Sequence, residues 1–126
     1  MEILSKRPSV RGPAEWFTGD VHFDVIAPGT EARGKVNVVH FAPCARTAWH
    51  SHSLGQTLHV TDGVGLVQSR GGEVVEIRPG DVIYTPPDEE HWHGAAPDNF
   101  MVHTAIWEDD DATWGDHVTD EEYRAR

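Results

Sequence analysis

Short runs of apolar and β-branched residues, separated by glycine, proline and aspartate, are the feature that most constrains what this chain can fold into. Asp62-Gly63, Gly71-Gly72 and Pro79-Gly80-Asp81 are turn signals, because these residue types adopt positive φ or preset a tight turn. No segment before residue 115 has the apolar period of a helix. We therefore predict an all-β fold, with strands over Val21–Ala27, Lys35–Ala42, Thr57–Thr61, Gly65–Arg70, Glu73–Ile77, Val82–Thr85, His91–His93 and Met101–Trp107.

The length of 126 residues predicts a single domain, since a second hydrophobic core would have too few residues. Short strands at this spacing predict a sandwich or barrel of the jelly-roll type, which leaves few exposed strand edges. We expect an N-terminal arm over residues 1–15, the barrel over 16–107 and a C-terminal tail over 108–126. Thr119 and Glu122 have the spacing of a capping box, which predicts a short helical turn over Thr119–Arg126.

Composition and charge exclude several classes of function. The net charge of −11 opposes binding to a phosphate backbone, and the basic residues are scattered, so we expect no nucleic-acid partner. No apolar run approaches the roughly 20 residues of a membrane span, so we expect no membrane partner. The N-terminus lacks the apolar core of a signal peptide, which favours a cytoplasmic location. Cys44 is the only cysteine, so an intramolecular disulfide is excluded.

Two pairs of histidines indicate a metal site. His50 and His52 are two residues apart, and on an extended strand such residues face the same side about 6.6–6.8 Å apart. His91 and His93 repeat this spacing on a later strand. A lone His-x-His is more often surface decoration, but two such pairs, separated by a β-hairpin pattern, favour a shared ion. Neutral imidazole suits Mn, Fe, Co, Ni, Cu and Zn, and catalysis requires an open coordination position.

Strand alternation sorts the side chains near these pairs. If Gln56 faces the interior, Leu58 and Val60 face it too, whereas His59 faces away and is not a ligand. His103 shares a face with Trp107, but alternation does not decide whether that face borders a cavity. Structural or solvent-exposed roles are expected for His22, His40, His59 and His117. Core or subunit-contact roles are expected for Trp16, Trp49, Trp92 and Trp114.

Two segments resemble the motifs of the cupin superfamily. In WHSHSLGQTLHVTDG, His50, His52 and Gly63 match the first motif, and Gln56 stands where glutamate is usual. PGDVIYTPPDEEHWHG matches the second motif more loosely, with His91 as the motif histidine and a glutamate at 89 in place of glycine. GPAEWFTG, ARTAWHSHSLGQTL and PPDEEHWHGAAP are further similar to the bacterial cupin hydroxynitrile lyases, manganese-dependent enzymes that also use glutamine at this position.

The resemblance implies a site and its cofactor. One divalent transition metal, manganese foremost and iron, nickel, zinc or cobalt as alternatives, would be held by His50, His52, Gln56 and His91. His93 would lie beside it as a non-ligating acid or base, with the role of a further imidazole ligand left open. The substrate pocket would be lined by Asn37, Val39, Leu58, His103 and Trp107. A homodimer or homotetramer is the implied assembly.

The implied activity is reversible cleavage of a cyanohydrin, such as mandelonitrile, into a carbonyl compound and cyanide. The neutral Gln56 would leave the metal a stronger Lewis acid than a carboxylate ligand would, and His93 would accept the hydroxyl proton. Apolar neighbours such as Val39 and Leu58 favour an aromatic or hydrophobic substrate. At Trp107 the lyases are expected to carry a polar side chain, and the indole would narrow the pocket. A dioxygenase of the quercetinase type and a non-enzymatic metal-dependent small-molecule binding protein are the alternatives.

Overall fold

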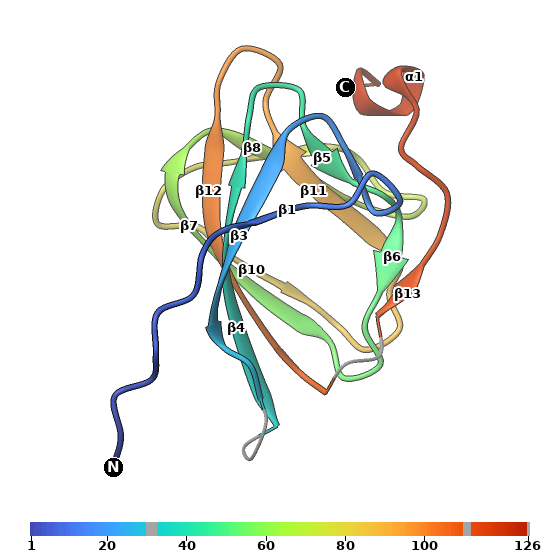
Figure 1. The fold of residues 1–126 in the computed structure, drawn as a ribbon. Coiled ribbons are helices and arrows are strands. Elements are labelled where there is room, and N and C mark those ends of the chain that lie inside the picture. The colour runs from blue at the N-terminus through green and yellow to red at the C-terminus, as the bar shows by residue number, and fades with distance from the viewer. Residues whose placement is uncertain (30–32, 110–111, 126) are drawn as a thin grey trace.

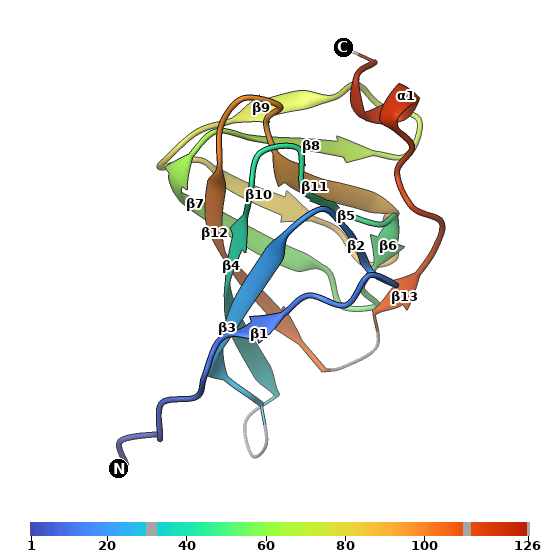
Figure 2. The same cartoon turned by 45° about the horizontal axis from the view of Figure 1, so that its top comes forward.

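Two antiparallel sheets curl around a shared interior in the computed structural model, which describes residues 1–29, 33–109 and 112–125 (Figure 1, Figure 2). The first sheet has the order β1 (Val10–Arg11), β3 (Val21–Ala27), β4 (Gly34–Phe41), β12 (Met101–Glu108), β7 (Gln56–Gly63) and β10 (Val82–Thr85). The second has the order β13 (Thr113–Trp114), β6 (His50–Ser51), β11 (His91–Ala95), β5 (Arg46–Thr47) and β2 (Phe17–Thr18). β8 (Gly65–Ser69) pairs with β11 and with β9 (Val75–Ile77).

The predicted all-β jelly-roll fold is confirmed. Each of the eight predicted strands has an observed counterpart, whose ends differ from the prediction by at most two residues. Five further strands, β1, β2, β5, β6 and β13, have only two residues each. Two residues carry no visible alternation, so these strands depend on hydrogen bonds to partners that only the folded chain supplies.

The capping box predicted at the C-terminus is present. Thr119 Oγ1 accepts from the backbone N–H of Glu122 at 3.1 Å, and Glu122 Oε1 accepts from the backbone N–H of Thr119 at 3.0 Å. The helix that follows, α1, spans Asp120–Tyr123 and is thus shorter than predicted, while residue 126 lies outside the described residues. The described chain contains no helix with the length and apolarity that a membrane span requires.

The predicted turns depend on backbone conformations that favour glycine. Gly63, Gly71 and Gly80 have φ values of +77°, +84° and +96°. At Gly63 the space is also restricted, because a Cβ added there would lie 1.9 Å from the carbonyl oxygen of Phe100. The end of β7 can therefore approach the loop before β12 only without a side chain.

The barrel interior is packed at one end and hollow at the other. On β4, Phe41 belongs to the apolar core, Val39 belongs to the core and borders a cavity, and Asn37 and Lys35, farther along the same face, line that cavity. The same division holds on neighbouring strands, and the core comprises Val21, Val39, Phe41, Ala45, Val60, Ile77, Ala95 and Met101. The packed end thus holds the strands in register, and the hollow end leaves room for a ligand.

Candidate metal centre and substrate cavity

Four buried imidazoles converge inside the barrel because β6 and β11 are paired. His50 lies opposite His91 in the antiparallel register, and their ring centroids are 4.3 Å apart. His52 and His93 each follow two residues after a member of this pair, and each ring lies 5.2 Å from that of His50. All four side chains are at most 5% exposed. The predicted convergence of the two pairs is therefore what the structure shows.

Backbone carbonyls orient two of these rings. His50 Nδ1 lies 2.9 Å from the carbonyl oxygen of Ala48, and His91 Nδ1 lies 3.0 Å from that of Glu89. Since a carbonyl oxygen can only accept, each Nδ1 carries the hydrogen and each Nε2 keeps its lone pair. His91 Nε2 lies 3.3 Å from Gln56 Oε1. The two rings thus present unprotonated nitrogens, as a metal ion requires.

A group of three nitrogens suits a divalent transition metal. One ring nitrogen from each of His50, His91 and His93 lies within 4.8 Å of the other two. His93 Nε2 is buried and has no hydrogen-bond partner within the described part of the chain, which is costly unless something else binds it. Three buried imidazoles with the amide oxygen of Gln56 3.3 Å from His91 Nε2 fit an ion that prefers nitrogen and neutral oxygen ligands. The compact group includes His93, which was expected beside the metal, and does not include His52, which was expected among the ligands.

Burial keeps these imidazoles neutral. Burial lowers the pKa of His50 and of His93 well below the usual imidazole value, and the neighbouring imidazoles lower it further. Burial also lowers the pKa of His91, and it lowers the pKa of His103 to about 4. His103 lies behind His93, with its Nε2 2.8 Å from His93 Nδ1, so one of these nitrogens donates to the other. At neutral pH the cluster is therefore in the protonation state that binds metals.

A cavity of about 400 Å³ opens beside the cluster. His52, Gln56 and His93 reach it from the cluster, and no acidic side chain is among the described residues that line it. Its walls are otherwise mostly aromatic and aliphatic, and comprise Trp16, Phe17, Phe23, Val25, Ala27, Pro28, Lys35, Asn37, Val39, Thr47, Ala105, Trp107, Ala112 and Trp114. A neutral polar end and apolar walls suit a small organic molecule.

The structure distributes the five expected pocket residues over three places. Asn37, Val39 and Trp107 line the cavity, and the ring of Trp107 lies 6.0 Å from that of His52. Leu58 lines a second hollow of about 260 Å³ instead, because its side chain points toward the gap between β10 and the β8–β9 pair. His103 is fully buried behind His93 and reaches neither space.

Several cavity residues were not expected from the sequence. Trp16 and Trp114, expected in the core or in subunit contacts, form part of the wall, with stacked rings 5.1 Å apart. Phe23 also lines the cavity and could have been found by alternation, since it shares a face of β3 with Val25 and Ala27. Trp114 lies on a two-residue strand, so the local sequence carried no comparable signal.

Comparisons with known proteins agree with this architecture. The family model described as "Cupin domain" matches residues 37–107. The chain is 51% identical to an (R)-mandelonitrile lyase from Granulicella tundricola, over 98% of this chain and 99% of the relative. The crystal structure of a cupin-like protein from Thermotoga maritima matches with a TM-score of 0.89 and 40% identity, over 98% of this chain and 96% of that one. A predicted oxalate decarboxylase from Thermotoga maritima, 17% identical over 82% of this chain and 96% of its own, shares the fold with a TM-score of 0.72. On this evidence the chain belongs to the cupin family.

Proposed function

We propose that this protein is a metal-dependent hydroxynitrile lyase that cleaves an aromatic cyanohydrin, such as (R)-mandelonitrile, into an aldehyde and hydrogen cyanide. The observation that carries the proposal is the meeting of His52, Gln56 and His93 at one cavity with apolar walls. The comparison that supports the proposal is the relative named (R)-mandelonitrile lyase, which matches along nearly the whole length of both chains.

The proposed metal ligands are His50, His52, Gln56 and His91, with manganese as the first metal to test. A divalent ion, when bound, supplies Lewis-acid stabilisation of negative charge on the substrate oxygen. Gln56 is neutral, so these four side chains contribute no negative charge that would weaken this effect. The carbonyls of Ala48 and Glu89 keep two of the imidazoles turned toward the centre.

His93 is the proposed proton carrier. Its Nδ1 is paired with His103, so Nε2 is the nitrogen available to a substrate in the cavity. His93 takes the hydroxyl proton of the cyanohydrin, the electrons of that O–H bond form the carbonyl double bond, and the carbon–carbon bond breaks. The electron pair of the broken bond leaves with cyanide. His93 then returns the proton to cyanide, which departs as hydrogen cyanide.

The cavity walls favour an aromatic substrate. Its volume of about 400 Å³ falls within the range of roughly 300–1,000 Å³ that is usual for small-molecule sites. Phe23, Val39 and Trp107 offer flat or apolar surfaces on three different strands. A phenyl ring can pack against these surfaces while the hydroxyl and nitrile groups face the polar end.

The decisive experiment measures cleavage of (R)-mandelonitrile by manganese-loaded protein under nitrogen. We expect benzaldehyde and cyanide in equal amounts, and a loss of roughly 100- to 10,000-fold in turnover for His93→Ala. His59→Ala is the matched control, because His59 lies on β7, the strand that carries Gln56, but is exposed. Benzaldehyde formation no faster than in buffer would overturn the proposal. Consumption of oxygen with a flavonol would favour a dioxygenase in its place.

A further inference from the structure

We propose that Trp114 is a positioning residue for the His50 imidazole, and that the segment carrying it is a working part of the metal centre. This segment, residues 113–123, is called here the C-terminal strap. It lies outside residues 37–107, which the family model matches. The inference concerns how a metal ligand is held, so it does not depend on which reaction the protein catalyses.

Trp114 stacks on both a proposed ligand and a second tryptophan. β13 pairs with β6, and Trp114 lies directly opposite His50 in the register. The two rings are stacked, with centroids 4.6 Å apart and planes inclined by 27°. Trp114 also stacks on Trp16, with centroids 5.1 Å apart and planes inclined by 6°. Stacking contacts thus connect two tryptophans of the cavity wall to the histidine cluster.

This contact restrains the one motion that the hydrogen bonding of His50 leaves open. The bond from Nδ1 to the carbonyl of Ala48 fixes one edge of the imidazole, but a ring held by a single bond can still swing about it. The flat face of Trp114 blocks that swing on one side and helps to keep His50 only 2% exposed. His50 Nε2 is thereby held toward the other imidazoles before any ion binds, which favours metal affinity.

Backbone hydrogen bonds hold the strap at the point where it passes the site. The N–H of Gly115 donates to the carbonyl of Trp49 at 2.7 Å, and the N–H of Trp49 donates to the carbonyl of Asp116 at 2.9 Å. The pairing thus continues beyond the end of β13 and ahead of the start of β6. Trp114 therefore lies on backbone that is fixed relative to His50.

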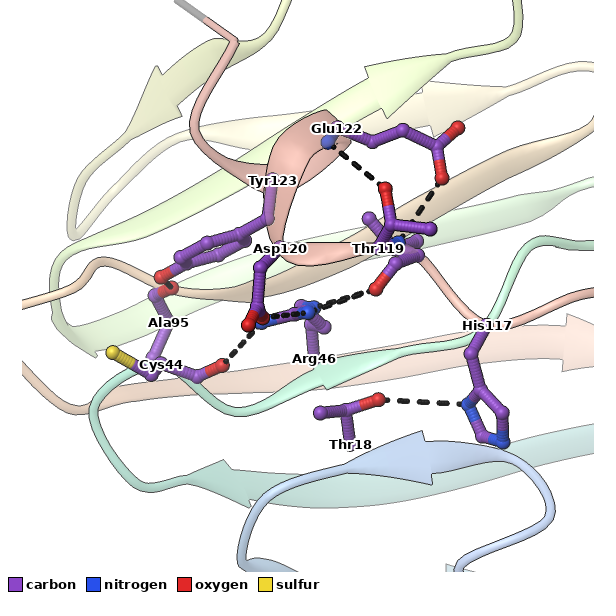
Figure 3. A network of polar contacts seen from close by, with 10 residues as sticks. Thr18, Cys44, Arg46, Ala95, His117, Thr119, Asp120, Glu122 and Tyr123 are labelled. Carbon is purple, nitrogen blue, oxygen red and sulfur yellow. Dashed lines mark hydrogen bonds and ion pairs between the residues drawn. The ribbon is translucent and has the colours of Figure 1, made fainter.

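A buried network fixes the far end of the strap to the second sheet (Figure 3). The guanidinium of Arg46, on β5, donates to the carbonyl of Val118 at 2.8 and 3.2 Å and lies 4.5 Å from the centre of the Tyr123 ring. Tyr123 is 1% exposed, and its hydroxyl donates to the carbonyl of Ala95 on β11 at 2.5 Å. The strap thus runs from the metal centre at β13 to an anchor at α1 (Figure 1, Figure 2).

The test is a titration of metal-free protein with Co²⁺, followed by visible absorption, which reports both the affinity and the ligand field. We expect Trp114→Ala to raise the Kd for Co²⁺ about 10- to 100-fold, the range for residues that orient metal ligands, and to shift the absorption bands. Trp114→Phe keeps an aromatic face, so we expect its Kd for Co²⁺ to lie within about threefold of the wild-type value. Phe100→Ala is the control, since Phe100 is 51% exposed in the loop before β12.

Trp114→Leu separates positioning from packing, because leucine keeps apolar bulk but has no flat ring. We expect Trp114→Leu to raise the Kd for Co²⁺ as much as Trp114→Ala does. If the alanine variant does not fold, the leucine variant alone tests whether Trp114 positions His50. A folded leucine variant with the wild-type Kd and the wild-type spectrum would overturn the proposal. The titration involves no turnover, so failure of the lyase assay would leave this result unaffected.

Discussion

At the scale of single residues, the candidate site places chemically identical side chains in slightly different surroundings. His50 and His91 are both oriented by backbone carbonyls and do not line the cavity. His52 and His93 both line the cavity, but only His93 lies in the compact three-nitrogen group. The difference between ligand and proton carrier therefore depends on small differences in position and partner rather than on residue type.

Separate replacement of His52 and His93 distinguishes their roles. We expect His52→Ala to raise the Kd for Mn²⁺ by more than about 100-fold, beyond the effect of residues outside the ligand shell. His93→Ala should change this Kd by less than about tenfold while lowering turnover roughly 100- to 10,000-fold. Paramagnetic resonance of free Mn²⁺ measures both affinities. The opposite pattern would make His93 the ligand and His52 the proton carrier.

At the scale of secondary-structure elements, the turns and the C-terminal strap determine how strands from distant parts of the chain meet. Gly63 allows the end of β7 to pass close to Phe100, and Arg46 connects β5 to the strap. Neither contact takes part in the chemistry, yet both fix strands that carry site residues. Their effects should appear first in stability.

Gly63→Ala tests the close approach at the end of β7. The change adds a Cβ 1.9 Å from the Phe100 oxygen in addition to the strain of a positive φ, so we expect a loss of more than about 2 kcal/mol in the free energy of unfolding. Gly71→Ala is the matched control, because its φ of +84° is similar but no atom lies within 4 Å of the added Cβ. Urea unfolding measures both. Equal losses would show that strain alone matters.

Arg46→Met tests the anchor of the strap. The variant leaves the buried carbonyl of Val118 without its donor, so we expect a loss of about 2–3 kcal/mol in the free energy of unfolding. Asp120→Asn should cost less than about 1 kcal/mol, since the Asp120 side chain that pairs with Arg46 is 77% exposed. Thermal unfolding compares the two. Similar losses would mean that the ion pair, rather than the backbone contact, holds the strap.

At the scale of the whole molecule, the metal and the fold are expected to be coupled. The candidate ligands lie on β6, directly after it, on β7 and on β11, and these strands belong to both sheets, so an ion would join the two sheets through one point. Whether copies of the chain assemble as a homodimer or homotetramer stays a prediction, which light scattering in solution would test.

Removal of metal should lower the melting temperature, and a fall in pH should reduce the stabilisation that the metal provides. Binding at 100 times the Kd stabilises the folded state by about 2.7 kcal/mol. Protons compete with the ion for imidazole nitrogens, so this stabilisation is present above the imidazole pKa and is lost as the pH falls through it. Burial lowers the pKa of His50 and His91, which places the loss below about pH 6.5. Melting curves with Mn²⁺ or with chelator at several pH values measure this, and identical curves would exclude the coupling.

The sequence by itself determined the eight longer strands and which side chains share a face of a strand. Alternation put Gln56 and Leu58 on the buried side of β7 and His59 on the exposed side, because successive residues of a strand face opposite ways. The spacing of His50 and His52 likewise put both imidazoles on the buried side. These properties follow from local geometry, which one strand carries alone.

Only the tertiary structure decided which buried residues share a space. Leu58 is buried as predicted but lines a different hollow from Val39, and His103 is buried behind His93 rather than at the cavity. Trp114 reaches His50 only because two-residue strands that are far apart in the sequence are paired. Periodicity tells which face of a strand is covered, whereas the packing of one sheet against the other determines what covers it.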